Sequence, residues 1–333
     1  MLTLACSADR EDEVVDLPTR ALLLAAGSAG HVAVLDADTL ASVGTLSVGA
    51  GLHPHHFGTD GTRVLVTATS EDLSEGHGGT AGGGGHMHGS GGHSIVYELG
   101  SDGRLREVIE VDAIAHNAAF LPGGDTIVLG MAEHGMIQAY DADTFAATWW
   151  TQCGSSPLEV TPSDDAVIVA NAGEASVSVV DVASHEVRAT VEVETTPVGA
   201  WRSADGSLHV TTEGGGTVDR ITLDPPAVAA SIDVGGVPGQ AFVTPDGAEL
   251  WVTVEDRGVI ARYDARSDEA RGEIVAGTKP HALLFDGARA LVTDEGGDML
   301  FAVDVASATV VDEVEVPGAP NGLALWTPPV DGE

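Results

Sequence analysis

The stretch "PLEVTPSDDAVIVANAGEASVSVVDVASHEVRATVEVE", residues 157–194, decides the fold. It contains four short runs in which apolar and polar residues alternate: PLEVTPS, DAVIVANAG, VSVVDVAS and EVRATVEV. Gly, Asp and Pro separate these runs, and alternation with this punctuation is typical of half-buried β-strands joined by tight turns. The stretch therefore predicts one four-stranded antiparallel unit.

The same unit recurs along the chain at a period of about 40 residues. An alternating strand that ends in Asp marks each copy, as in VAVLDADT, MIQAYDADT, VSVVDVAS, DRITLDPP, IARYDARS and FAVDVAS, with SIVYELGSDG as a degenerate copy. Turn pairs such as Asp205-Gly206 and Asp246-Gly247 return with the same step. Seven such units predict an all-β protein, a seven-bladed β-propeller.

The two ends of the repeat region complement each other. The first unit begins in mid-repeat with RALLLAAGS, and the last segment, APNGLALWTP, is a spare innermost strand. We expect this C-terminal strand to complete the first blade and close the ring, which removes exposed sheet edges. The expected boundaries are a leader and acidic linker over 1–19, one propeller over 20–328 and a tail over 329–333.

The leader MLTLACSADREDE resembles the clipped end of a secretory signal, with a lipobox-like LAC before the acidic linker. It predicts an extracytoplasmic protein, in the periplasm or at the cell surface, with Cys6 as the candidate for a lipid anchor. The sequence has no apolar run of about 18 residues that could span a membrane. Two cysteines provide no disulfide framework. We expect a monomer.

The net charge of −37 argues against nucleic acid and against anionic membranes as partners, because both require a positive surface. It suits a solvated surface, and it also attracts cations.

Histidines recur where the chain leads into the innermost strands. Aligned on the Pro of each segment, or on Ala115 in the third blade, the next residues are His55, His116, Leu158, Val198, Gly239, His281 and Asn321. His53 lies two residues before His55 and should point the same way in an extended strand, whereas His56 should point to the opposite side. The loops between the second and third strands, expected on the same face, add His134 and several carboxylates, among them Asp294.

The segment GHGGTAGGGGHMHGSGGHS, residues 76–94, cannot pack a core. It belongs to an insertion of about 23 residues in the blade that carries His55. We expect a flexible loop over 70–93 on the channel-mouth face, with His77, His86, His88 and His93 as a second, weaker metal site. Surface disorder without function is the alternative.

Neutral imidazole and carboxylate groups are the ligands that zinc prefers, together with thiolate. The sequence therefore predicts a Zn²⁺ site at the channel mouth with His53, His55, His116, His134, His281 and Asp294 as candidate ligands. Copper is an alternative, because Met87 between His86 and His88 offers a softer ligand.

The strands DAVIVANAGEASVSVVDVAS and ELWVTVEDRGVIARYDARS resemble the YVTN-type propeller repeat over nearly the whole folded chain. With its histidine-bearing channel mouth and its inserted loop, the chain is similar to the AztD family of periplasmic zinc metallochaperones. The resemblance implies a protein that passes zinc to the solute-binding protein of a zinc ABC importer. It implies His53, His55 and His116 as site candidates and residues 77–93 as the flexible element.

On this interpretation the protein is not an enzyme. A metal-dependent, lactonase-like hydrolase would use the same residues to activate water, and it stays the first alternative. A non-catalytic surface or protein-binding propeller is the second. The sequence contains no G-x-S-x-G nucleophile motif.

Overall fold

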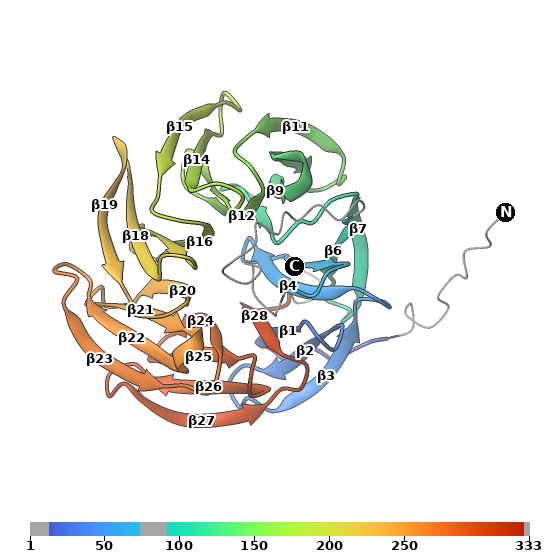
Figure 1. Ribbon diagram of the computed structural model, residues 1–333. Helices are drawn as coiled ribbons and strands as arrows, with labels where there is room; N and C mark the ends of the chain where they lie inside the picture. Colours follow the sequence, from blue (N-terminus) through green and yellow to red (C-terminus); the bar gives the residue numbers. More distant parts are fainter. Residues whose placement is uncertain (1–12, 74–91, 330–333) are drawn as a thin grey trace.

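The computed structural model of the protein describes residues 13–73 and 92–329. These residues form seven four-stranded antiparallel sheets arranged in a ring (Figure 1). Helical elements include the short 3-10 turns η2 (Ala132–His134) and η3 (Glu255–Arg257). The prediction of an all-β, seven-bladed propeller is confirmed.

Each blade runs from an innermost strand at the central axis to an outermost strand at the rim. The innermost strands are β28 (Pro320–Trp326), β4 (His53–Thr59), β8 (Ala118–Phe120), β12 (Pro157–Pro162), β16 (Pro197–Arg202), β20 (Pro238–Val243) and β24 (Pro280–Asp286). The second strands are β1 (Ala21–Ala26), β5 (Val64–Thr69), β9 (Thr126–Met131), β13 (Ala166–Asn171), β17 (Leu208–Thr212), β21 (Glu249–Val254) and β25 (Arg289–Asp294).

The two outer layers follow in the same order around the ring. The third strands are β2 (His31–Asp36), β6 (Ser94–Leu99), β10 (Met136–Asp141), β14 (Ser176–Asp181), β18 (Thr217–Leu223), β22 (Val259–Asp264) and β26 (Met299–Asp304). The outermost strands are β3 (Ser42–Ser47), β7 (Leu105–Val111), β11 (Ala147–Gln152), β15 (Val187–Glu192), β19 (Pro226–Asp233), β23 (Ala270–Val275) and β27 (Thr309–Glu315).

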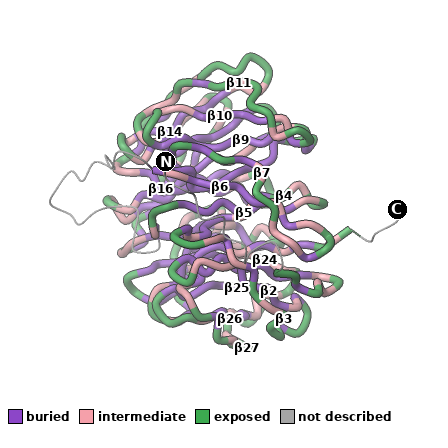
Figure 2. The backbone as a smooth tube through the Cα atoms, turned by 90° about the vertical axis from the view of Figure 1, so that its right-hand side faces the viewer, coloured by how far each residue is buried: buried purple, intermediate pink, exposed green. Residues whose placement is uncertain are grey.

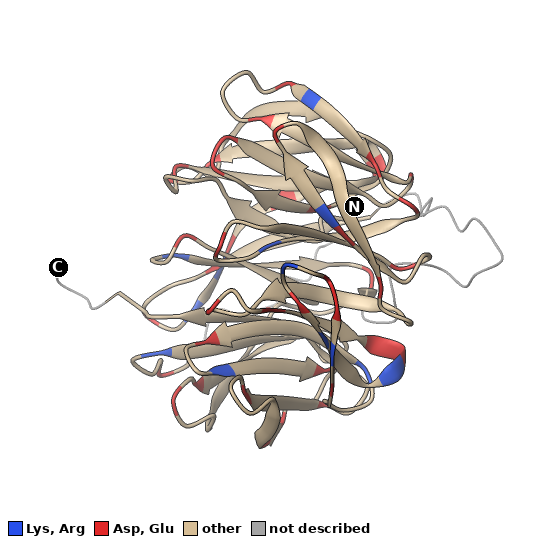
Figure 3. Ribbon diagram, turned by 90° about the vertical axis from the view of Figure 1, so that its left-hand side faces the viewer, with Lys and Arg blue, Asp and Glu red and all other residues tan. Residues whose placement is uncertain are grey.

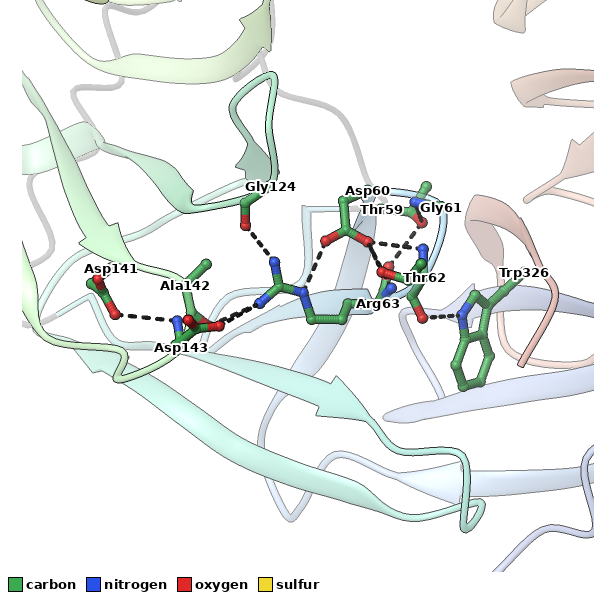
Figure 4. Close-up of polar contacts among 10 residues, drawn as sticks. All are labelled: Thr59, Asp60, Gly61, Thr62, Arg63, Gly124, Asp141, Ala142, Asp143 and Trp326. Carbon is green, nitrogen blue, oxygen red and sulfur yellow. Dashed lines mark hydrogen bonds and ion pairs between the residues drawn. The ribbon is translucent and has the colours of Figure 1, made fainter. Parts of the chain in front are cut away.

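The ring is closed by the C-terminal strand, as predicted. β28 pairs antiparallel with β1, with Ala21 opposite Trp326, so the first blade has the order β28-β1-β2-β3. The Nε1 of Trp326 donates a hydrogen bond to the carbonyl of Thr62 in the next blade, at 3.0 Å (Figure 4). Arg63 in the same turn donates to the carbonyls of Gly124 and Ala142 in the third blade. Side chains therefore tie three consecutive blades together.

Burial follows the layers (Figure 2). Second strands such as β1, β5 and β13 are buried at every residue, whereas outermost strands such as β23 and β27 are largely exposed. The apolar side chains pack between neighbouring blades, and one cluster joins Leu23 and Val34 of the first blade to Val66 and Tyr97 of the second. This packing holds the innermost strands in fixed positions around the axis.

The recurring Asp at the end of the third strand shapes the turn to the outermost strand. The Oδ1 of Asp36 accepts hydrogen bonds from the backbone N and the hydroxyl of Thr39, at 2.8 and 2.7 Å. Asp141 makes the same pair of bonds to Thr144. Such Asx turns are the physical reason for the Asp-x-x-Thr/Ser signature in the sequence.

Most innermost strands contain an irregularity near their first residues. The pairing register shifts between Pro54 and Phe57 in β4, and comparable shifts occur in β12, β16, β20 and β24. A bulge breaks the alternation of side chains and re-aims one of them. In β4 the shift spans His55 and His56, so both can face the same neighbourhood.

Acidic residues are spread over the turns and outer strands, and basic residues are few (Figure 3). The sequence has 51 Asp and Glu against 14 Lys and Arg. Across residues 13–73 and 92–329, no helix is long and apolar enough to cross a membrane.

Candidate metal centre

Three consecutive innermost segments bring His56, His116 and Glu159 together. One ligand atom of each residue lies within 4.8 Å of the other two. His56 lies on β4, His116 just before β8, and Glu159 on β12. The three residues are only 7%, 2% and 3% exposed, and the two imidazole centroids are 4.4 Å apart. Two imidazoles and one carboxylate at this spacing could hold a metal ion.

The Glu159 carboxylate is fixed through both oxygens. Its Oε2 lies 2.7 Å from Nδ1 of His116, and its Oε1 accepts a hydrogen bond from Nδ2 of Asn117 at 2.7 Å. Asn117 is itself held by the backbone N and carbonyl of Val160. A carboxylate paired with an imidazole is the arrangement that orients histidine ligands in metal sites.

Burial also determines the charge of Glu159. Burial raises the pKa of this carboxyl well above its usual range, and the nearby His281 charge offsets only part of that shift. Without a cation, burial shifts this carboxyl toward its protonated form, because the charged form is poorly solvated there. A cation that bound here would displace that proton.

A second ionisable cluster adjoins the first. The Nδ1 of His281 lies 2.7 Å from Oε1 of Glu255, and its ring centroid is 6.2 Å from that of His56. Burial lowers the pKa of His281, but Glu295 and Glu255 outweigh that effect and raise it to about 9. A Cβ at Gly239 would lie 2.7 Å from Oγ1 of Thr253, 3.0 Å from the carbonyl of His281 and 3.2 Å from Oε1 of Glu255, so the backbone packs closely against this pair.

Two cavities flank these groups. A small one of about 10 Å³ is lined by His56, His116, His281, Glu255 and Trp201, among others. It has room for about one water molecule or one ion. A larger one of about 510 Å³ is lined by Glu159, Asn117, Trp201 and several aromatic side chains. Glu159 thus borders the larger cavity while it contacts His116.

Among the candidate ligands from the sequence, His116 belongs to the three-residue group, and His55 lies beside it. The ring of His55 is 5.8 Å from that of His116. Its Nδ1 lies 2.9 Å from Nδ2 of Asn321, and its Nε2 accepts a hydrogen bond from the backbone N of Leu73 at 3.4 Å. His281 lies near the group but is paired with Glu255.

The other candidates lie apart. His53 is half-buried, with its Nδ1 2.9 Å from the carbonyl of Gly27. His134 is exposed at the end of η2. Asp294 is buried but accepts hydrogen bonds from the backbone N of Thr278 and of Lys279. Its carboxylate therefore shapes the turn before β24.

The candidates in the inserted segment divide into two groups. His77, His86 and His88 lie outside the described residues. His93 is described, and its carbonyl accepts a hydrogen bond from the backbone N of Ser70 at 2.8 Å. Its Nε2 lies 3.8 Å from Glu110. The Ser70–His93 pair joins the two ends of the segment.

Sequence reasoning placed His56 away from the site and did not consider Glu159. The bulge in β4 explains the first error, because it suspends the alternation on which the assignment depended. A signal for Glu159 was present: a Glu between Leu158 and Val160 on an innermost strand must be buried, and a buried carboxylate needs a partner.

No family model and no curated protein matches the chain. Solved structures share its fold. The periplasmic gluconolactonase PpgL of Pseudomonas aeruginosa aligns with a TM-score of 0.70 at 20% identity, over 93% of this chain and 99% of that chain. A functionally unknown protein from Desulfotomaculum acetoxidans aligns with a TM-score of 0.66 at 13% identity, over 93% and 99%.

Dihydro-heme d1 dehydrogenase NirN, solved in complex with DHE, aligns with a TM-score of 0.62 at 19% identity. The alignment covers 89% of this chain and 63% of that one, so this chain spans less than two thirds of its length. At these identities the likeness concerns the fold alone, and proteins named for different activities share it. The chain is a seven-bladed β-propeller with a buried His/Glu group at its axis.

Proposed function

We propose that the protein is an extracytoplasmic zinc metallochaperone that holds Zn²⁺ at His56, His116 and Glu159. It passes the ion to the solute-binding protein of a zinc ABC importer, as proteins of the AztD family do. The observation that carries this proposal is the donor group itself. Two imidazoles and a carboxylate from three blades meet, and the two imidazoles line a cavity of only about 10 Å³.

The donor set suits zinc. Nitrogen and oxygen donors in a group of three, with a further position for water or another ligand, are typical of zinc sites that exchange their fourth ligand. A cargo site needs such an open position, because the acceptor must bind the ion before the chaperone releases it. The acidic surface raises the local concentration of cations and supports loading.

The histidine-rich segment is the proposed relay between this site and the acceptor. Its described beginning lies against the site: Leu73 donates to His55 and packs with Ile114, two residues before His116. A segment tethered there would offer His77, His86 and His88 at high effective concentration. The leader with Cys6 supports export of the chain, with lipid attachment as one way to keep it near the importer.

Zinc titration against a competing chelator tests the proposal. The unaltered chain should show one tight class of site, and His56→Ala with His116→Ala should remove it. His134→Ala is the matched control, because that histidine is exposed and should leave the tight class unchanged. Equal affinity in the double variant and the control would overturn the assignment.

A metal-dependent hydrolase is the second candidate, and the larger cavity favours it. Its volume of about 510 Å³ would admit a small organic substrate next to Glu159. A bound ion would then supply an activated water. Zinc-loaded protein should be assayed with aldonolactones: catalytic turnover that disappears in Glu159→Gln would support the hydrolase, and its absence together with transfer of zinc to the acceptor would support the chaperone.

A further inference from the structure

Lys279 is the only lysine of the sequence, and all other basic side chains are arginine. The lysine lies just before β24, where its ammonium meets two carboxylates. Its Nζ is 2.7 Å from Oε2 of Glu295 and 3.9 Å from Oε2 of Glu255. The Lys279 side chain is 29% exposed, whereas those of Glu295 and Glu255 are only 4% and 10% exposed. The single lysine ammonium of the protein therefore meets two buried carboxylates.

These carboxylates come from neighbouring blades. Glu255 follows β21, and Glu295 follows β25. The Oε1 of Glu255 is paired with His281, so its Oε2 is the oxygen that faces Lys279. The buried Oε2 of Glu295 receives no hydrogen bond of good geometry, and its close partner is the charge of Lys279. Two carboxylates are thus balanced by one ammonium and one imidazolium.

Lysine and arginine differ in how they fill such a position. An ammonium is a compact point charge on a flexible stem, whereas a guanidinium is a planar fork that binds carboxylates through two parallel bonds. A compact charge between carboxylate oxygens of two blades occupies the place that a small cation would take. Removal of that charge would leave buried carboxylate charge uncompensated, which is strongly unfavourable.

We propose that the ammonium of Lys279 occupies a divalent-cation position between Glu255 and Glu295 and keeps it closed. Lys279 is thus a specificity-determining residue that limits this buried group of side chains to one ion. The statement that one ion is bound rests on the proposed zinc site. The statement that Lys279 fills the position between Glu255 and Glu295 does not depend on that site. Loss of the ammonium opens a second, oxygen-rich site beside the His56–His116–Glu159 group.

Mn²⁺ is the probe for this site, because carboxylate oxygens suit it and histidine-rich segments prefer other metals. Free Mn²⁺ is measured by electron paramagnetic resonance during titration of Lys279→Met and Lys279→Arg. Lys279→Met should bind one additional Mn²⁺ per chain, and Lys279→Arg should match the unaltered protein. Both variants carry the same surface acids, so superposed isotherms for the two variants and the unaltered chain would overturn the proposal.

Lys279→Met and Lys279→Arg are then compared in a His56→Ala background. The additional ion should persist there, because its ligands are Glu255 and Glu295. Loss of zinc binding in this background therefore tests the proposed function separately from the closed position.

The single lysine permits a test on protein that has already folded with its native side chain. Acetylation of the folded, unaltered protein neutralises Lys279 and should add one Mn²⁺ per chain. Acetylated Lys279→Arg, in which only the α-amino group reacts, is the control. An acetylated Lys279 with unchanged Mn²⁺ stoichiometry would also overturn the proposal.

Discussion

Nδ1 of His116 and Oε2 of Glu159 lie 2.7 Å apart, although 43 residues separate them in the chain. They belong to neighbouring blades, and both are buried. The pair exists because the propeller places successive innermost segments side by side around one axis. Its position in the sequence gives no hint of the contact until the repeat is recognised.

Glu159→Gln should weaken zinc binding by about 10- to 100-fold, in the range seen when a carboxylate partner of a metal site is altered. The amide keeps the shape of the side chain but removes its charge. Zinc binding to the unaltered chain should also release more protons than binding to the variant, because the pKa of Glu159 is raised by burial. Calorimetry in buffers of different ionisation enthalpy measures both effects, and equal proton release would contradict the role of Glu159.

The metal-free protein should lose stability as the pH rises from about 6.5 to about 9. The pKa of His281 is raised from 6.5 to about 9 in the folded state, so the folded chain binds the proton more tightly than the unfolded chain. That contribution is fully present below pH 6.5 and disappears above about 9, a difference of about 3 kcal/mol. The raised pKa values of Glu295 and Glu159 also make stability fall with rising pH, starting from their ordinary value of 4.5.

Urea denaturation across this pH range measures the effect. His281→Gln should reduce the slope of the unfolding free energy against pH. His185→Gln, at an exposed histidine, should leave that slope unchanged. A slope that His281→Gln does not alter would show that another group titrates.

Gly322→Ala should destabilise the ring closure. A Cβ at this position would lie 1.9 Å from the carbonyl of His55 in the next blade, a contact that forces the backbone apart. Overpacking of this kind costs about 1–3 kcal/mol. Gly214→Ala is the control, because its Cβ would meet Thr195 at an ordinary 3.5 Å. Thermal unfolding compares the two variants. Equal stabilities would mean that the contact between β28 and His55 accommodates a methyl group without loss of stability.

Replacement of residues 74–91 by a short Gly/Ser linker should preserve the tight zinc site and remove the weaker class. Leu73 and His93 remain, so the contacts of the segment's ends with His55 and Ser70 are kept. Zinc transfer to the acceptor should slow, because the tethered relay is gone. Stopped-flow transfer measures the rate, and an unchanged rate would remove the segment from the mechanism.

The fold could be predicted because the propeller repeats its signals. The Asp that ends five of the seven third strands makes an Asx turn in the structure, and the spare segment at 319–328 contains β28. Both features follow from local chemistry that the sequence displays directly. His116 was found in the same way, by alignment of the segments that lead into the innermost strands.

The rest of the site depends on geometry that is not local. A bulge in β4 turns His56 toward His116. The residue types of HPHHF, residues 53–57, do not predict that bulge. His281 contacts Glu255, which follows β21 of the neighbouring blade, and no motif in the sequence links the two residues. Such relations between blades need coordinates, whereas the buried charge of Glu159 could have been suspected from its apolar neighbours.

The three donors lie on three consecutive blades, so an ion bound to them would bridge two blade interfaces, β4 to β8 and β8 to β12. Transient separation of either interface would break the coordination. The residence time of the ion would then depend on how often these two interfaces open. Amide hydrogen exchange would register this as protection confined to one side of the ring.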